Sequence, residues 1–222
     1  MAIAFVSGSN TAYGPRTNIT IAPPAGLADG NIMVAQIAVG DGAIRTPGTP
    51  TGWNVFGTDF SDNAAGFFVN NRTFWKRALS ESGSYTFTTI SSSSSAGWIG
   101  CYSGCIATGT PLAATLTNTG TGTTSTGLGI TTTAPNSFLL WLGQDFADTT
   151  NPLSPPTGMT ERLDAVVIYT ADQLIASAGP TGNRTMTNNS GSSSPWGVRM
   201  VELLAATGGG TTTYVFNPPF LP

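Results

Sequence analysis

The side chains that could carry chemistry are few, and histidine is absent from the chain. A Ser-His-Asp or Cys-His site therefore cannot be built, which leaves paired carboxylates or a bound metal ion. Only 11 residues are Asp or Glu, and two pairs share one spacing, Asp59-x-x-Asp62 and Asp145-x-x-Asp148. We expect both pairs in loops after central strands, where they cap turns or bind calcium or a sugar hydroxyl. Calcium takes about six to eight oxygen ligands, so we favour the capping role and predict no enzyme, cofactor or metal site.

The two cysteines lie four residues apart, in the string Cys101-Tyr102-Ser103-Gly104-Cys105. On a regular strand, at about 3.3 Å per residue, they are too distant for a disulfide unless the chain bends at Gly104. The usual Cys/His metal sets are impossible without histidine. We therefore expect two free, buried thiols.

The tryptophans are a further candidate site, because a sugar-binding module exposes a planar row of aromatic rings. The set is Trp53, Trp75, Trp98, Trp141 and Trp196. The last three lie in apolar runs. Trp53 follows a Pro-Thr-Gly turn, and Met159 follows a second copy of that turn. Both residue types fill gaps in cores, so we expect packing roles, with Trp75 beside Lys76 and Arg77 left open.

Charge is scarce along the whole chain. Charged residues make up 9% of the sequence and the formal net charge is −3, whereas about 25% charged residues is typical. Lys76-Arg77 is too small a basic cluster for binding nucleic acid. No apolar run reaches the ~20 residues that cross a bilayer, and the first residues lack the charged region of a signal peptide. We expect a protein made in the cytoplasm that binds neither nucleic acid nor membrane.

Composition and a long internal repeat predict the fold. Thr and Val favour strands, and 28 Gly and 15 Pro mark turns. The turn Pro50-Thr51-Gly52-Trp53 recurs as Pro156-Thr157-Gly158-Met159, and each turn follows an apolar run, Asn31–Val39 or Phe138–Gly143. The repeat exceeds the roughly 20 to 50 residues of a solenoid or propeller unit. We therefore predict an all-β, antiparallel, jelly-roll-like sandwich over residues 1–206, built from related halves at about 20–116 and 130–204.

Several segments receive a local prediction. One or two opening strands are expected before residue 22, separated by a loop over Gly8–Pro15. Three further segments rich in Ser, Thr, Asn and Gly are expected to be loops, namely Thr117–Gly129, Ser91–Ser95 and Asn188–Ser194. Ala165–Ala178 has a spacing that a helix could use, but its β-branched residues favour a strand.

Residues 207–222 differ from the rest of the chain. A Gly/Thr tether leads into an extended arm that carries Tyr214, Phe216, Pro218, Pro219 and Phe220. Prolines lower the entropy that an extended segment loses on binding, so we expect this arm to dock on another subunit or a partner. The alternative is that it folds back over an edge of its own sandwich.

The turn and core strings resemble a known family. Residues 24–35, Pro50–Trp53, Phe74–Arg77 and Tyr85–Thr88, with Thr133–Ser137, Pro155–Arg162 and Ala178–Gly182, look like a β-sandwich family common in tailed-phage structural genes and prophages. The resemblance covers roughly residues 20–204. Its motifs mark fold more than activity, and the family has no catalytic residues to carry over.

The resemblance implies a virion protein, either a capsid decoration (cement) protein or a tail or fibre component. We expect a cement protein that binds the major capsid protein as a homotrimer at local symmetry axes of the shell, after assembly in the host cytoplasm. The alternative is a tail or fibre protein whose sandwich binds a carbohydrate or another receptor.

Overall fold

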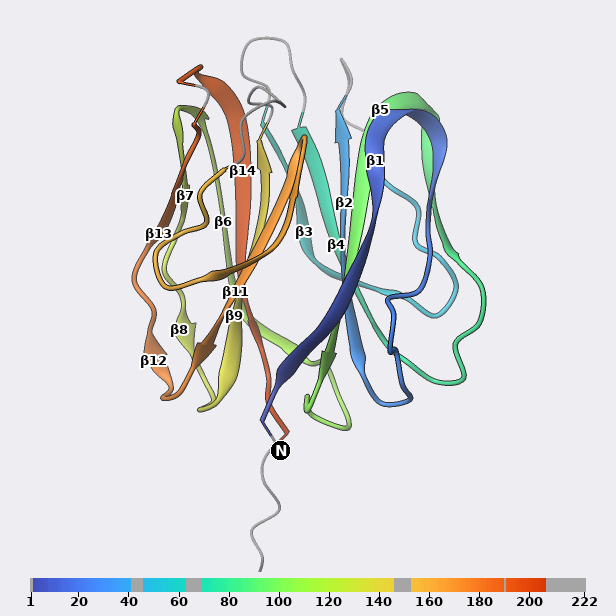
Figure 1. The fold of residues 1–222 in the computed structure, drawn as a ribbon, viewed down its shortest axis with the longest axis vertical. Coiled ribbons are helices and arrows are strands. Elements are labelled where there is room, and N and C mark those ends of the chain that lie inside the picture. The colour runs from blue at the N-terminus through green and yellow to red at the C-terminus, as the bar shows by residue number, and fades with distance from the viewer. Residues whose placement is uncertain (1, 41–45, 63–68, 146–152, 190, 207–222) are drawn as a thin grey trace, which may run out of the picture.

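The computed structural model describes residues 2–40, 46–62, 69–145, 153–189 and 191–206. Throughout these ranges the chain forms strands and turns without any helix, and the two large sheets face each other (Figure 1). All strand pairs in both sheets are antiparallel. The predicted all-β, antiparallel sandwich is confirmed.

Each half of the chain forms one five-stranded sheet. Sheet 1 has the order β1 (Ala4–Ile21), β5 (Tyr85–Ser103), β2 (Ile32–Gly40), β4 (Val69–Arg77) and β3 (Asn54–Asp62). Sheet 2 has the order β6 (Leu112–Gly122), β14 (Ser194–Leu203), β9 (Ser137–Asp145), β11 (Ile168–Ile175) and β10 (Thr160–Ala165). In both sheets the first and last strands of the half lie together, followed by the second, fourth and third. The two halves thus share one topology.

A two-stranded ribbon folds over the outer face of each sheet. In the first half, β1 and β5 bend together and run on (Figure 1), and Asn18–Ile21 pairs with Tyr85–Thr88. In the second half, separate short strands take this place: β7 (Thr124–Gly127) pairs with β13 (Arg184–Thr187), and β8 (Thr131–Thr132) pairs with β12 (Gly179–Pro180). The body therefore has four layers, two sheets between two ribbons.

Three apolar clusters fill the spaces between these layers. The inner cluster lies between the sheets and includes Val34, Trp98, Leu140, Leu142 and Val201. The outer cluster of sheet 1 joins Met33, Ile37 and Phe74 to the ribbon residues Ile19 and Phe87. The outer cluster of sheet 2 joins Leu139, Trp141 and Met200 to Met186 of its ribbon. Strands β2 and β9 are buried on both faces, as their apolar runs predict.

The repeated turn has the same geometry in both halves. Gly52 has a φ of 81° and Gly158 a φ of 83°, values that suit the third residue of a type II turn. The amide of Trp53 donates to the carbonyl of Pro50 at 3.1 Å, and that of Met159 to the carbonyl of Pro156 at 3.0 Å. Trp53 and Met159 then enter the outer cluster of their own sheet.

Three of the predicted loops are wrong. Gly8–Pro15 lies inside β1, where register shifts absorb the irregular residues. Ser91–Ser95 lies inside β5, and most of Thr117–Gly129 forms β6 and β7. The backbones of these segments pair in ladders, and Thr suits a half-exposed edge or ribbon. A polar composition without charge therefore does not distinguish a loop from a peripheral strand.

The other two local predictions fare better. Asn188 and residues 191–193 lie outside strands, although Ser194 already opens β14. Ala165–Ala178 contains the strand β11, as its β-branched residues predict.

Candidate functional site

The two described aspartates of the candidate pairs hold the fold together. Asp59 lies in β3, where it forms an ion pair with Arg72 at 2.8 Å. Asp145 ends β9, is 1% exposed, and accepts hydrogen bonds from the hydroxyls of Ser125 and Ser194. The predicted loop placement is wrong for both. The Asp62 side chain and Asp148 lie outside the described part of the chain, within which no group of three or more Cys, Asp and Glu side chains could hold a metal ion.

The prediction of free, buried thiols is confirmed. Cys101 lies opposite Met33 on the outer face of sheet 1, whereas Cys105 belongs to the inner cluster. Burial raises the pKa of Cys101 to about 11 and that of Cys105 to about 12. Both groups therefore stay protonated and unreactive at neutral pH.

Tryptophan packing is confirmed as well. Trp53, Trp98, Trp141 and Trp196 are each at most 7% exposed. Trp75 is half-buried against the inner cluster, which resolves the one position that the sequence left open. These rings fill the core and present no planar row to a sugar.

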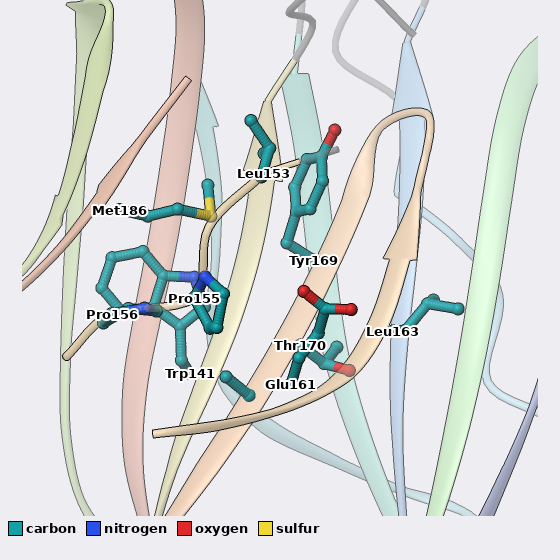
Figure 2. A pocket seen from close by; sticks show the side chains of 10 residues that line it. Trp141, Leu153, Pro155, Pro156, Glu161, Leu163, Tyr169, Thr170 and Met186 are labelled. Atoms are coloured by element: carbon teal, nitrogen blue, oxygen red, sulfur yellow. The ribbon is translucent and has the colours of Figure 1, made fainter. Parts of the chain in front are cut away.

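A small pocket lies beside β10 and β11 (Figure 2). It is lined by Trp141, Leu153, Pro155, Pro156, Glu161, Leu163, Tyr169, Thr170, Ala171 and Met186. Its volume of about 10 Å³ admits roughly one water molecule, which excludes a sugar ring.

Glu161 gives this pocket its only carboxylate. Burial raises the pKa of Glu161, and the nearby charge of Asp164 raises it further. Asp164 itself accepts a hydrogen bond from the Leu153 amide at 2.8 Å and so anchors the pocket wall. Sequence reasoning missed this pair, although Glu161-x-x-Asp164 has the same spacing as the two aspartate pairs that it singled out.

A larger cleft of about 340 Å³ opens at the end of sheet 1 where β2 begins. It is lined by residues 23–24 and 26–29 together with Ala78, Ser80 and Glu81. Glu81 accepts hydrogen bonds from Lys76 at 2.7 Å and from Tyr85 at 2.9 Å. Burial alone would raise the pKa of Glu81, but these hydrogen bonds hold it below its ordinary value. The carboxylate is therefore committed to the turn that it braces.

Arg199 joins the two sheets. It projects from β14 and is 1% exposed, and its guanidinium donates to the Phe56 carbonyl at 3.0 Å and to the Thr58 carbonyl of β3. Burial lowers the pKa of Arg199 to about 10, which the negative charge of Asp59 partly opposes. Gly57, with a φ of 68°, leaves room for the guanidinium at the bulge of β3, where any Cβ would collide with it.

A second set of polar contacts ties the sheets together at the opposite edge. Arg162 forms a bidentate ion pair with Asp172, with both distances at 2.8 Å. The Tyr102 hydroxyl of sheet 1 donates to the same carboxylate at 3.2 Å, and the Phe5 ring lies 4.4 Å from the Arg162 guanidinium carbon. Neither link was predicted, because each depends on which strands meet across the sandwich.

The predicted docking residues Tyr214, Phe216, Pro218, Pro219 and Phe220 lie outside the described residues. The described chain ends at Ala206, whose amide donates to the Gly104 carbonyl at 2.8 Å.

Comparison with protein-family models, with curated proteins and with solved structures found no match. Among the described residues there is also no helix long and apolar enough to cross a membrane.

Proposed function

We propose that this chain is a non-enzymatic structural protein of a tailed-phage virion, a decoration (cement) protein that binds and stabilises a shell of major capsid proteins. The turn and core strings that resemble the phage β-sandwich family support this proposal. Its homotrimeric state and its place in the virion belong to the same proposal.

The observation that carries the proposal is that acidic side chains fasten the body together. Asp172 joins the two sheets, Asp145 ties β7 and β14 to β9, and Glu202 accepts three hydrogen bonds from Thr133 and one from Ala134. Carboxylates held in this way brace loops and strands and are committed before any substrate could arrive. A body of four layers that acidic side chains brace suits a shell protein, since local opening exposes a chain to proteolysis.

The alternative, a tail or fibre protein with a sugar-binding sandwich, requires exposed aromatic rings. Trp53, Trp98, Trp141 and Trp196 are buried, so they do not favour it.

The number of copies in purified particles tests the proposal. Quantitative mass spectrometry of this chain against the major capsid protein should give comparable copy numbers if the chain coats the shell. A ratio of a few copies per particle would contradict the cement role and make glycan binding the next measurement.

Removal of residues 207–222 tests how the protein attaches. We expect the remaining body, residues 1–206, to keep its thermal transition and to lose binding to shells, because a tethered arm adds avidity. A full-length variant with Tyr214, Phe216 and Phe220 changed to Ala is the matched control for chain length. Shell occupancy equal to that of the unaltered chain would contradict docking by the arm, and light scattering tests the trimer separately.

A further inference from the structure

We propose that the two sheets bind a layer of ordered water molecules between them, at the end of the sandwich where β2 and β9 finish. The residues that hold it, here named the polar layer, are Gln36, Asn71, Thr73, Gln144 and Arg199. Each is at most 1% exposed.

The alternation of each strand places these side chains on the inner faces. Gln36 lies between Val34 and Ala38, and both of these belong to the inner cluster. Gln144 follows Leu140 and Leu142 of the same cluster on β9. The inner faces therefore carry these polar side chains next to apolar ones, and Ile168 of the inner cluster lies opposite Gln144.

Contacts across the sandwich bring the polar layer together. The Gln36 amide group donates to the Gly143 carbonyl at 2.7 Å, and the Asn71 amide nitrogen donates to the Gln144 Oε1 at 3.3 Å. Thr73 lies opposite Gln36 on one side and opposite Phe56 on the other, and Phe56 supplies a carbonyl to Arg199.

Each of the five side chains also carries a buried polar atom with no hydrogen-bond partner among the described residues. These atoms are Gln36 Oε1, Asn71 Oδ1, Thr73 Oγ1, Gln144 Nε2 and Arg199 Nε. A buried polar group that stays unpaired lowers the folding equilibrium constant by roughly a factor of ten or more. Five such groups together would lower the folding equilibrium constant roughly a hundred-thousandfold. Whole domains have folding equilibrium constants of only about 10³ to 10⁸. The five atoms therefore need partners that the described part of the protein does not supply.

Water is the partner that fits all five. The unpaired atoms include donors, on Gln144 and Arg199, and acceptors, on Gln36 and Asn71. An anion would satisfy only the donors and a cation only the acceptors, whereas water does both. Exchanging the O and N atoms of both the Asn71 and Gln144 amides leaves one donor and one acceptor unpaired again, so the conclusion does not depend on how these amides are oriented.

The isosteric substitution Thr73→Val tests the proposal by the sign of its effect. If the Thr73 hydroxyl binds water, its loss leaves that water short of a partner, and we expect the folding equilibrium constant to fall about tenfold in denaturant titration. If the hydroxyl is unpaired, the substitution removes a buried polar group, and an unchanged or increased folding constant would overturn the proposal. Thr132→Val is the matched control, because the buried Thr132 hydroxyl already pairs with Gly179 at 3.1 Å.

A crystal structure of the full chain tests the occupant directly. Water oxygens within hydrogen-bond distance of Gln36 Oε1 and Gln144 Nε2 are the expected result. A dry layer, or density for a chloride or a larger molecule there, would overturn it. Thr132→Val should weaken folding without changing this layer, whereas Thr73→Val should remove at least one water molecule from it.

Discussion

In the first half the ribbon over the sheet is made by β1 and β5, which bend and continue, whereas in the second half the short strands β7 and β13 take that place. Both ribbons do the same thing, which is to cover the outer apolar face of their own sheet. What the two halves share is therefore the order of strands and the faces they bury. The halves differ in whether the sheet strands continue into the ribbon or the ribbon is formed by separate short strands.

The inner faces differ more in chemistry. Trp98 lies opposite Gln36 on β2, and Arg199 lies opposite Leu142 on β9. Since Gly52 and Gly158 fix how the halves correspond, Trp98 and Arg199 occupy equivalent places. The first half fills this place with an indole ring, and the second with a guanidinium that reaches across to the other sheet.

The largest loss in the free energy of unfolding is expected from truncating the side chains at these two equivalent positions. Trp98→Ala should lower the free energy of unfolding by about 3–5 kcal/mol because it leaves a cavity. Arg199→Ala should cost about as much, because it removes a fully buried side chain and leaves two partly buried carbonyls without donors. Urea unfolding measures both. A loss below about 1 kcal/mol for Arg199→Ala would show that the guanidinium does not join the sheets.

A smaller loss is expected from Glu202→Gln. The Glu202 carboxylate holds the start of the chain segment before β9, with the Thr133 amide at 2.9 Å and the Ala134 amide at 3.0 Å from Oε1. An amide side chain offers only one acceptor oxygen, so we expect the free energy of unfolding to fall by about 2 kcal/mol. In the first half Cys101 occupies the equivalent place, and its thiol donates one long hydrogen bond, to Asn31 Oδ1 at 3.6 Å. Cys101→Ala should therefore leave the segment before β2 anchored. Slower hydrogen exchange at the Thr133 amide in Glu202→Gln would contradict the role of Glu202 as a brace.

The repeated turns should respond equally to one change. Gly52→Ala and Gly158→Ala each place a Cβ at positive φ, beside the flexible side chains of Lys76 and Gln173. We expect each to lower the free energy of unfolding by about 1 kcal/mol. Gly57→Ala should cost more, because its Cβ meets the Arg199 guanidinium. Unequal losses at the two turns would break the correspondence between the halves.

The smallest effect concerns the pH dependence of stability, which should have opposite signs for Glu81 and Glu161. The pKa of Glu81 lies below its ordinary value of 4.5, so its contribution to stability is present above that pH and is lost as the pH falls through the folded-state pKa. The pKa of Glu161 is raised, so its folded state loses stability as the pH rises from 4.5 through the folded-state pKa. At neutral pH, Glu81→Gln should destabilise and Glu161→Gln should not, each by less than about 1 kcal/mol. Thermal melts from pH 3 to 8, a range of about 5 units around these pKa values, measure both.

Sequence patterns predict the turns and strands of this molecule that depend on neighbouring residues, and they miss contacts between residues far apart in the chain. The turns at Gly52 and Gly158, the strands β2 and β9, and the packing of Trp141 follow from short patterns of residue types. Thr117–Gly129, most of which forms β6 and β7, reads as a loop because uncharged Thr and Gly residues occur in both loops and peripheral strands. The role of Arg199 cannot be predicted from the sequence, because its partner Phe56 lies 143 residues away. The two residues meet only because the two sheets face each other. For the same reason Gln36 and Gln144 read as ordinary strand residues.

The pairing of β1 with β5 has a consequence for synthesis on the ribosome. Ala4 lies opposite Ser103, 99 residues later in the chain. At about 5–20 residues per second, β1 emerges roughly 5 to 20 seconds before its partner exists. During that time it is an unpaired strand, and unpaired strands are prone to pair with the wrong neighbour. The hydroxyl and glycine residues that make Gly8–Pro15 look like a loop also leave the middle of β1 little apolar surface to aggregate with before its partner is made.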